Sequence, residues 1–206
     1  MFGKKLISAV IAGTLLLGSL GASSVSAAPQ KNGGMRDITT MELVRDMGIG
    51  INLGNTFEAC GDWIAQWSDG TPSAYETAWG SPVITKQIIE GMAKEGFGVL
   101  RIPVAWSNMM PQDGNYTISP AYAERVREVV DWTIGSGMYA IINIHWDGGW
   151  VNNFPDAKDE SMQRFAHMWE QIAASFRDYS DYLMFESQNE ELGWEDIWNP
   201  WSGTQE

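Results

Sequence analysis

The stretch Tyr182-Leu-Met-Phe-Glu-Ser-Gln-Asn-Glu-Glu-Leu-Gly-Trp194 decides the fold of this chain. Its first four residues are typical of a strand, and the polar residues that follow end at a Gly-Trp pair. With the two-residue period of a strand, Glu186, Gln188 and Glu190 share one face. Burying a carboxylate is costly unless it is paired or neutralised, so two carboxylates on one face are unusual in ordinary core. The alternative is a strand end that enters a solvated acidic loop.

The first 27 residues are typical of a secretory signal peptide. Lys4 and Lys5 form a basic start, an apolar run follows at 6–20, and Val25-Ser26-Ala27 supplies the small residues of a cleavage site. The apolar run is too short and too interrupted to favour a transmembrane helix. We therefore expect a secreted, extracellular protein that begins at Ala28.

The remaining chain is acidic and rich in tryptophan. The full sequence has 206 residues, 11 of them Trp, and a formal charge of −13, which becomes −15 if Lys4 and Lys5 leave with the signal. Nucleic acid and anionic membranes are poor partners for such a surface, whereas a neutral polymer is unaffected. Cys60 is the only cysteine, so no internal disulfide can form. We expect a flexible leader at 28–38 and one domain at 39–206.

Strand-like and helix-like segments alternate along this domain. The predicted strands are 48–55, 98–104, 139–145 and the stretch from 182, and the predicted helices are 41–47, 81–95, 119–135 and 160–179. Long loops follow the strands, the longest at 56–80, and short turns precede them. Strands connected in this way are parallel and joined by right-handed crossovers, which predicts an α/β fold.

Polar residues lie at or near the carboxyl ends of the four predicted strands. They are Asn55, Arg101, His145 and Glu190. In a (β/α)8 TIM barrel, this rim is where catalytic groups belong. The four strands begin 50, 41 and 43 residues apart, so four more units of that size would need roughly 180 further residues to close eight strands.

Four motifs at these strand ends resemble glycoside hydrolase family 5. They are Gly50-Ile-Asn-Leu-Gly-Asn55, Arg101 in a Leu-Arg-Ile-Pro strand, Asn143-Ile-His145 and Phe185-Glu-Ser-Gln-Asn-Glu190. The resemblance implies a (β/α)8 barrel of which about the first four β/α units are present. It departs from the family's pattern at Trp146, where many relatives have a second His, and at Glu191, where Pro is frequent.

The resemblance also assigns roles to individual residues. It implies that Glu190 is the general acid/base, that Asn189 contacts the sugar 2-hydroxyl, and that Arg101 and His145 order the nucleophile region and the substrate. The implied activity is that of a cellulase-like endo-β-1,4-glucanase, which hydrolyses plant-type β-glycans with retention. The family's nucleophile is a second Glu on strand seven, so it would lie beyond Glu206 and the chain would be the N-terminal half of such an enzyme.

Glu186 is unsuitable as the second carboxylate. A retaining glycosidase needs two carboxyl groups about 5–5.5 Å apart, and an inverting one about 6.5–9.5 Å. Glu186 lies four residues from Glu190, roughly 13 Å along an extended strand. We expect it to be a structural partner, paired with Arg101.

Aromatic rings offer flat apolar faces for sugar rings, and nine of the Trp residues follow predicted strand ends. The nine are Trp63, Trp67, Trp79, Trp106, Trp146, Trp150, Trp194, Trp198 and Trp201. Each alone is more often a packing residue, but together their one-sided placement favours a sugar cleft. The predicted substrate-binding residues for a β-glucan are Asn55, Arg101, His145, Asn189, Trp79, Trp146, Trp150 and Trp194.

No cofactor or metal is expected, because the loop acids Asp147, Asp156 and Asp159 lack a ligand spacing typical of a metal site. Three hypotheses for function follow. The chain is half of a secreted endo-β-glycanase, a non-catalytic sugar-binding fragment that uses the same Trp-lined rim, or a half barrel that needs a complementary C-terminal half as its partner. The sequence leaves open whether the glycan is cellulose, mixed-linkage glucan, xyloglucan or mannan.

Overall fold

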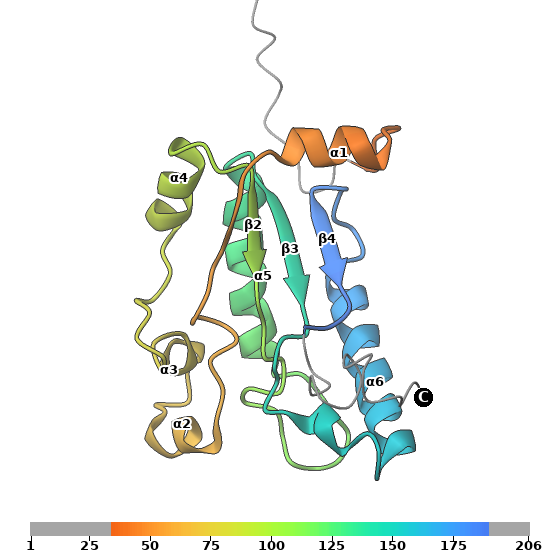
Figure 1. Ribbon diagram of the computed structural model, residues 1–206. Coiled ribbons are helices and arrows are strands. Elements are labelled where there is room, and N and C mark those ends of the chain that lie inside the picture. Colours follow the sequence, from red (N-terminus) through yellow and green to blue (C-terminus); the bar gives the residue numbers. More distant parts are fainter. Residues whose placement is uncertain (1–33, 190–206) are drawn as a thin grey trace, which may run out of the picture.

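A single parallel sheet forms the centre of the computed structural model, which describes residues 34–189 (Figure 1). Its strands are β1 (Gly50–Asn52), β2 (Val99–Ile102), β3 (Tyr139–Asn143) and β4 (Leu183–Glu186). They lie in the order β1-β2-β3-β4, and each neighbouring pair is parallel. The predicted order and direction of the strands are therefore confirmed.

Helices connect the strands and cover one face of the sheet. They are α1 (Thr40–Met47), α2 (Asp62–Trp67), α3 (Pro72–Glu76), α4 (Lys86–Lys94), α5 (Pro120–Gly135), the 3-10 helix η1 (Trp150–Asn153) and α6 (Lys158–Phe176). In Figure 1, α5 and α6 lie behind the sheet and α1 crosses the amino ends of the strands. The helices α2 and α3 lie at the opposite end, toward which the strands point.

The segment before α4 differs from the prediction. Ser81-Pro82 does not begin a helix, and α4 starts only at Lys86, after an N-cap at Thr85. Ile84 is buried in the core, and its N–H donates to the buried carboxylate of Glu76 at 3.0 Å. This anchoring holds Ile84 outside the helix, so a typical capping sequence is overridden by tertiary contacts.

The predicted loop at 56–80 is also wrong, because it contains α2 and α3. These helices have six and five residues, too few for the helical period of apolar residues to become visible in the sequence. Trp63 and Trp67 therefore lie on a helix rather than in a loop.

The core lies between the sheet and the helices. Leu100, Ile102, Ile142 and Leu183 of the sheet pack with valines of α5 and with the buried stripe of α6, which is Met168, Ile172 and Phe176. Two apolar residues of this region are not covered, since Ile49 is 71% exposed and Phe185 is 48% exposed. Both belong to the edge strands or their ends, where a neighbour is present on one side only.

The other face of the sheet carries half-buried side chains. Arg101, Ile141, Met184 and Glu186 are of intermediate exposure. Val99 on the same face is buried. Its side chain covers Gly50, where an added Cβ would lie only 2.7 Å from Val99 Cγ1.

The segment that leads into α1 is fastened to the amino end of the sheet. Arg36 Nε donates to Asp181 at 2.7 Å, and the guanidinium lies over Tyr182 and Tyr139, whose rings are stacked 4.3 Å apart. Arg36 lies in the predicted flexible leader at 28–38, so these contacts correct that prediction for its last residues. The predicted signal peptide lies outside the described residues. Within 34–189, no helix combines the length and apolar character needed to cross a membrane.

Candidate active site

Polar side chains from three neighbouring strands meet at the carboxyl edge of the sheet. Arg101 lies on β2 and Glu186 at the end of β4, and Asn143 ends β3 between them. The register pairs Asn143 directly with Glu186. His145 and Asn189 follow β3 and β4 and complete what we call the polar cluster, namely Arg101, Asn143, His145, Glu186 and Asn189.

A bidentate ion pair between Arg101 and Glu186 is the centre of the polar cluster. Arg101 Nε donates to Glu186 Oε2 at 2.6 Å, and Arg101 Nη2 donates to Glu186 Oε1 at 2.5 Å. This geometry fixes the orientation of both side chains. Hydrogen bonding to Arg101 holds the pKa of Glu186 below its ordinary value, against the opposing effect of burial and with help from Asn143. The expected structural pairing of Glu186 with Arg101 is confirmed.

Two amides and an imidazole extend from this ion pair. Arg101 Nη2 also donates to Asn189 Oδ1 at 2.9 Å. Asn143 Nδ2 donates to Glu186 Oε1 at 3.2 Å and lies 3.2 Å from His145 Nδ1. Asn189 Nδ2 lies 3.4 Å from His145 Nε2. The polar cluster is therefore one connected network, and it contains three of the predicted substrate-binding residues, Arg101, His145 and Asn189.

Asn143 belongs to this network but was not among the predicted site residues. It is fully buried, and its Oδ1 accepts from the backbone N–H of Val104 at 3.2 Å. The backbone carbonyl of Asn143 accepts from Trp106 Nε1 at 2.7 Å. The signal was present in the sequence, because the alternation of the predicted strand puts Asn143 on the same face as His145.

The turn after β1 holds the predicted residue Asn55. Asn55 is exposed and has a φ of 59°, which lies in the left-handed region. Its backbone N–H donates to Glu58 Oε1 at 2.5 Å, and that of Thr56 donates to Glu58 Oε2 at 2.8 Å. Glu58 is buried, so its carboxylate fixes this turn. Nothing in the sequence pattern identified Glu58.

The predicted Trp residues differ in their surroundings. Trp79 and Trp146 are exposed, and Trp146 keeps 45% of its surface accessible. Trp150 is buried; its Nε1 donates to Asp147 at 3.1 Å, and Arg164 lies over its ring. That is the environment of a packing residue. Glu190 and Trp194 lie outside the described residues, so their roles stay predictions.

Buried Asp147 ties the loops of this rim together. It accepts from the backbone N–H of Ser107 at 2.9 Å and from Ser107 Oγ at 2.6 Å. Burial raises the pKa of Asp147, and the hydrogen bonds from Ser107 oppose that shift. Arg164 donates to Ser107 Oγ and is half-buried itself. Asp147 is thus a structural acid that joins the loops after β2 and β3.

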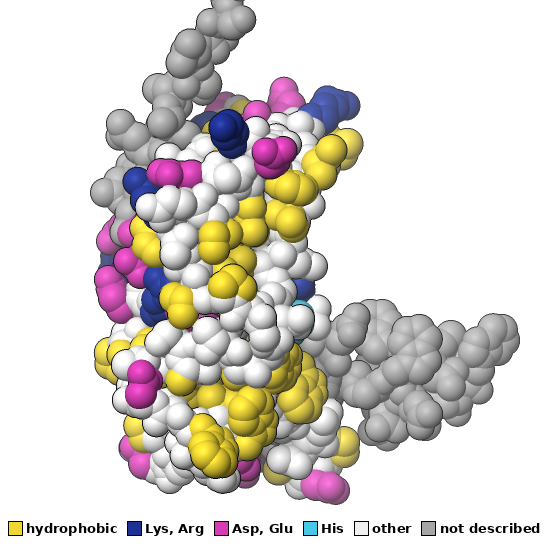
Figure 2. All heavy atoms as spheres, turned by 90° about the vertical axis from the view of Figure 1, so that its left-hand side faces the viewer, with side chains coloured by type: hydrophobic (Ala, Val, Ile, Leu, Met, Phe, Trp, Pro, Cys, Tyr) yellow, Lys and Arg dark blue, Asp and Glu magenta, His cyan; other side chains and the backbone are white. Residues whose placement is uncertain are grey.

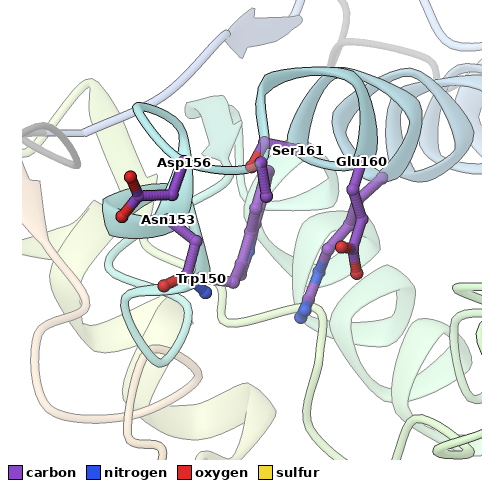
Figure 3. Close-up of a pocket in the computed structure, with 7 residues that line it drawn as sticks. Trp150, Asn153, Asp156, Glu160 and Ser161 are labelled. Carbon is purple, nitrogen blue, oxygen red and sulfur yellow. The ribbon is translucent and has the colours of Figure 1, made fainter.

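A cavity of about 220 Å³ lies beside the contacts of Asp147, between η1 and the first turns of α6 (Figure 3). Trp150 and Asn153 come from η1, and Glu160, Ser161 and Arg164 come from α6. None of the residues that line it belongs to the polar cluster. The arrangement that fits the predicted chemistry is the polar cluster on the sheet, not this cavity.

Residues 63–206 match the family model for cellulase (glycosyl hydrolase family 5). The chain belongs to glycosyl hydrolase family 5. The fold of which β1–β4 are a part is therefore the (β/α)8 TIM barrel, as the resemblance implied, and the polar cluster lies on the carboxyl rim of that barrel.

Curated relatives are similar over most of this chain. A xyloglucan-specific endo-beta-1,4-glucanase of Bacteroides ovatus is 45% identical over 160 residues, which is 77% of this chain and 31% of the relative. A cellulase/esterase of Acetivibrio thermocellus is 37% identical over 91% of this chain and 24% of its own length. The chain thus spans less than a third of these two family 5 proteins.

Solved structures show the same relation. A GH5-4 broad specificity endoglucanase from Clostridium longisporum superposes with a TM-score of 0.70 at 34% identity, covering 84% of this chain and 47% of that structure. One from Ruminococcus champanellensis, with bound cellotriose, superposes with a TM-score of 0.68 at 38% identity over 75% of this chain and 44% of that structure. The chain spans just under half of each.

Proposed function

We propose that the protein containing this chain is a secreted endo-β-1,4-glucanase that hydrolyses β-glucans with retention of configuration. The observation that carries the proposal is a hydrogen bond. Arg101, which is paired with Glu186, donates to the side chain of Asn189, the residue directly before Glu190. Glu190 is the proposed acid/base. The nucleophile is a carboxylate outside the 206 residues of this chain.

The polar cluster orients Asn189 for substrate. Arg101 occupies Asn189 Oδ1, so the Nδ2 group is the part of this amide that donates to a sugar hydroxyl. The backbone N–H of Asn189 donates to the carbonyl of Ile144 at 3.1 Å, which ties the end of β4 to β3. A donor held in this way strengthens its contact with the 2-hydroxyl as oxocarbenium character develops.

The substrate is proposed as a neutral β-1,4-linked glucan. The formal charge of −13 disfavours polyanions, and the relatives include a xyloglucan-specific enzyme and broad specificity endoglucanases. Reducing-sugar release from cellulose, mixed-linkage glucan, xyloglucan and mannan by the full-length protein identifies the preferred polymer. Release from mannan alone would contradict a glucanase.

Replacement of the proposed acid/base tests the mechanism. In the full-length protein, Glu190→Gln should lower kcat on glucans and on glycosides with poor leaving groups by at least about a hundredfold, because no proton reaches the leaving oxygen. Activated aryl glycosides should lose much less at the first step. The neighbouring Glu191→Gln is the matched control. Equal, small losses on both kinds of substrate would remove Glu190 from this role.

Export is tested on the protein itself. N-terminal sequencing of material from the culture medium should give a chain that begins at Ala28, because Val25-Ser26-Ala27 is a small-residue cleavage site. A cell-bound chain that still begins at Met1 would mean that the apolar run at 6–20 is a membrane anchor.

A further inference from the structure

We propose that Trp63 and Trp67 of α2 form an aromatic platform that binds a β-glucan chain, in addition to the polar cluster. The proposal rests on the proposed function and extends it: Trp63 and Trp67 are two of the nine Trp residues whose placement favours a sugar cleft, but neither is among the predicted substrate-binding residues. Neither indole belongs to the polar cluster or to the cavity beside Asp147.

The two indoles are displayed on the surface of the molecule. Trp67 is 84% exposed and Trp63 is 48% exposed, whereas Ile64 between them is buried in the core. Residues four apart on a helix are neighbours on its surface. Ile64 therefore anchors α2 while both indoles stay outside. Two large aromatic side chains left exposed together mark a surface that binds something.

The backbone before α2 is shaped to hold one of these rings. Gly61 has a φ of 145°, and an added Cβ there would lie 2.7 Å from Trp63 Nε1 and 2.9 Å from its Cδ1. The indole of Trp63 thus lies directly against the backbone of Gly61, in space that any other residue would fill. A ring fixed in this way loses little conformational freedom when a ligand stacks on it.

The position of α2 suits a ligand of the barrel rim. α2 lies at the end toward which the strands point, the same end as the polar cluster (Figure 1). Figure 2 looks onto the side of α2, α3 and α4 and shows hydrophobic side chains at that end as well as further up the same face. Exposed Trp79 follows α3 in the same loop region. A chain bound on the platform can therefore continue along the rim.

The charge around the platform selects a neutral ligand. The sequence has no Lys or Arg between Arg45 and Lys86, while Asp62 and Asp69 flank the two indoles. A polyanion finds no partner there, and a second copy of this acidic chain would be repelled. Pyranose rings present apolar faces without charge. Positions four apart are about 6 Å apart along a helix axis, which suits consecutive rings of one polymer chain.

The experiment compares the full-length protein with its Trp63→Ala/Trp67→Ala double variant. In gels that contain soluble β-glucan, we expect affinity electrophoresis to give a dissociation constant for the variant that is at least about fivefold higher, because two stacking faces are lost. The KM for the polymer should rise more than the KM for short cello-oligosaccharides. Trp67→Phe, which keeps a stacking face, should restore part of the affinity. Met41→Ala on α1, which removes an exposed apolar side chain at the opposite end, is the control.

Several outcomes would overturn the platform. Unchanged retardation of the double variant would do so. A double variant that binds glucan like wild type but has a lower melting temperature or a changed molecular mass would also overturn it. The indoles would then be covered by another part of the protein or by a second copy. If the wild-type protein is retarded by glucan but releases no reducing sugar, the proposed hydrolysis fails while the platform stands. If hydrolysis is normal and the double variant binds like wild type, the platform alone fails.

Discussion

Single residues of the polar cluster each satisfy more than one neighbour. Asn143 accepts from Val104 and donates to Glu186, and Arg101 serves both Glu186 and Asn189. The loss of one member therefore leaves others without partners, and the network fails as a unit. Its stability is best tested at Glu186, which carries the only negative charge in the polar cluster.

Glu186→Gln in the full-length protein should lower the free energy of unfolding near neutral pH by about 1 kcal/mol. This is less than a fully buried charged hydrogen bond contributes, because both partners are partly exposed and solvent screens them. Arg101 lowers the pKa of Glu186 in the folded protein, so the stabilisation is complete above the ordinary value of 4.5 and is lost as pH falls through the lower folded value.

The variant should consequently differ from wild type above pH 4.5 and converge with it in more acidic solution. Urea denaturation at a series of pH values measures this, with the exposed Glu170→Gln on α6 as control. A difference that persists unchanged into acid would contradict the ion pair as its source.

The same scale shows what the sequence can predict about the site. The pairing of Arg101 with Glu186 follows from the face that each occupies on its strand, so it could be predicted. Glu58 could not, because its partners are backbone N–H groups in a turn with a positive φ at Asn55. Asp147 could not either, because Ser107, its main partner, comes from another loop.

At the scale of elements, periodicity predicted each strand and the longer helices within residues 34–189. Ser119 accepts from the N–H of Tyr122 and begins α5, as its Ser-Pro sequence predicts. The same dipeptide at Ser81-Pro82 does not begin a helix, because Ile84 is buried in the core and its backbone N–H donates to Glu76. Local sequence is the same in both cases, and long-range packing decides between them.

The helix α1 offers a test at this scale. It has no buried residues, although its capping box at Thr39 and Glu42 is complete. Arg36 just before it bonds Asp46 of α1 and Asp181 before β4, so it ties the helix to the sheet. We expect Arg36→Ala to speed amide hydrogen exchange in α1 by on the order of tenfold, with β2 and β3 unaffected.

Hydrogen exchange read by mass spectrometry on the full-length protein separates these elements. Arg45→Ala is the matched control, because Arg45 is an exposed arginine in the last turn of the same helix. Faster exchange in the central strands would show that Arg36 stabilises the whole domain. Unchanged exchange in α1 would show that other contacts hold it.

At the scale of the whole molecule, the described part is a four-stranded parallel sheet whose edges are β1 and β4. A closed barrel has no edges, and parallel strands are normally buried on both faces. Here Ile141 and Met184 are only half-buried beside Arg101 and Glu186. In the (β/α)8 barrel of family 5, the cover for these side chains comes from the further strands that close the barrel.

Residues 28–206 produced alone should therefore associate with increasing concentration, bind dyes that report loose cores, and release no reducing sugar from β-glucan above the blank. Uncovered apolar surface and open edges compete with a net stability of only about 5–15 kcal/mol in intact domains. Activity should be missing for a second reason, since the family resemblance assigns the nucleophile to a Glu on a later strand of the barrel. Size-exclusion chromatography at several concentrations and a reducing-sugar assay, with the full-length protein as reference, measure both effects.

Affinity electrophoresis of the same material separates a sugar-binding half barrel from one that needs its C-terminal half to bind at all. A monodisperse monomer with a sharp thermal transition that cleaves β-glucan would place the nucleophile within these residues or show that the strand count is wrong.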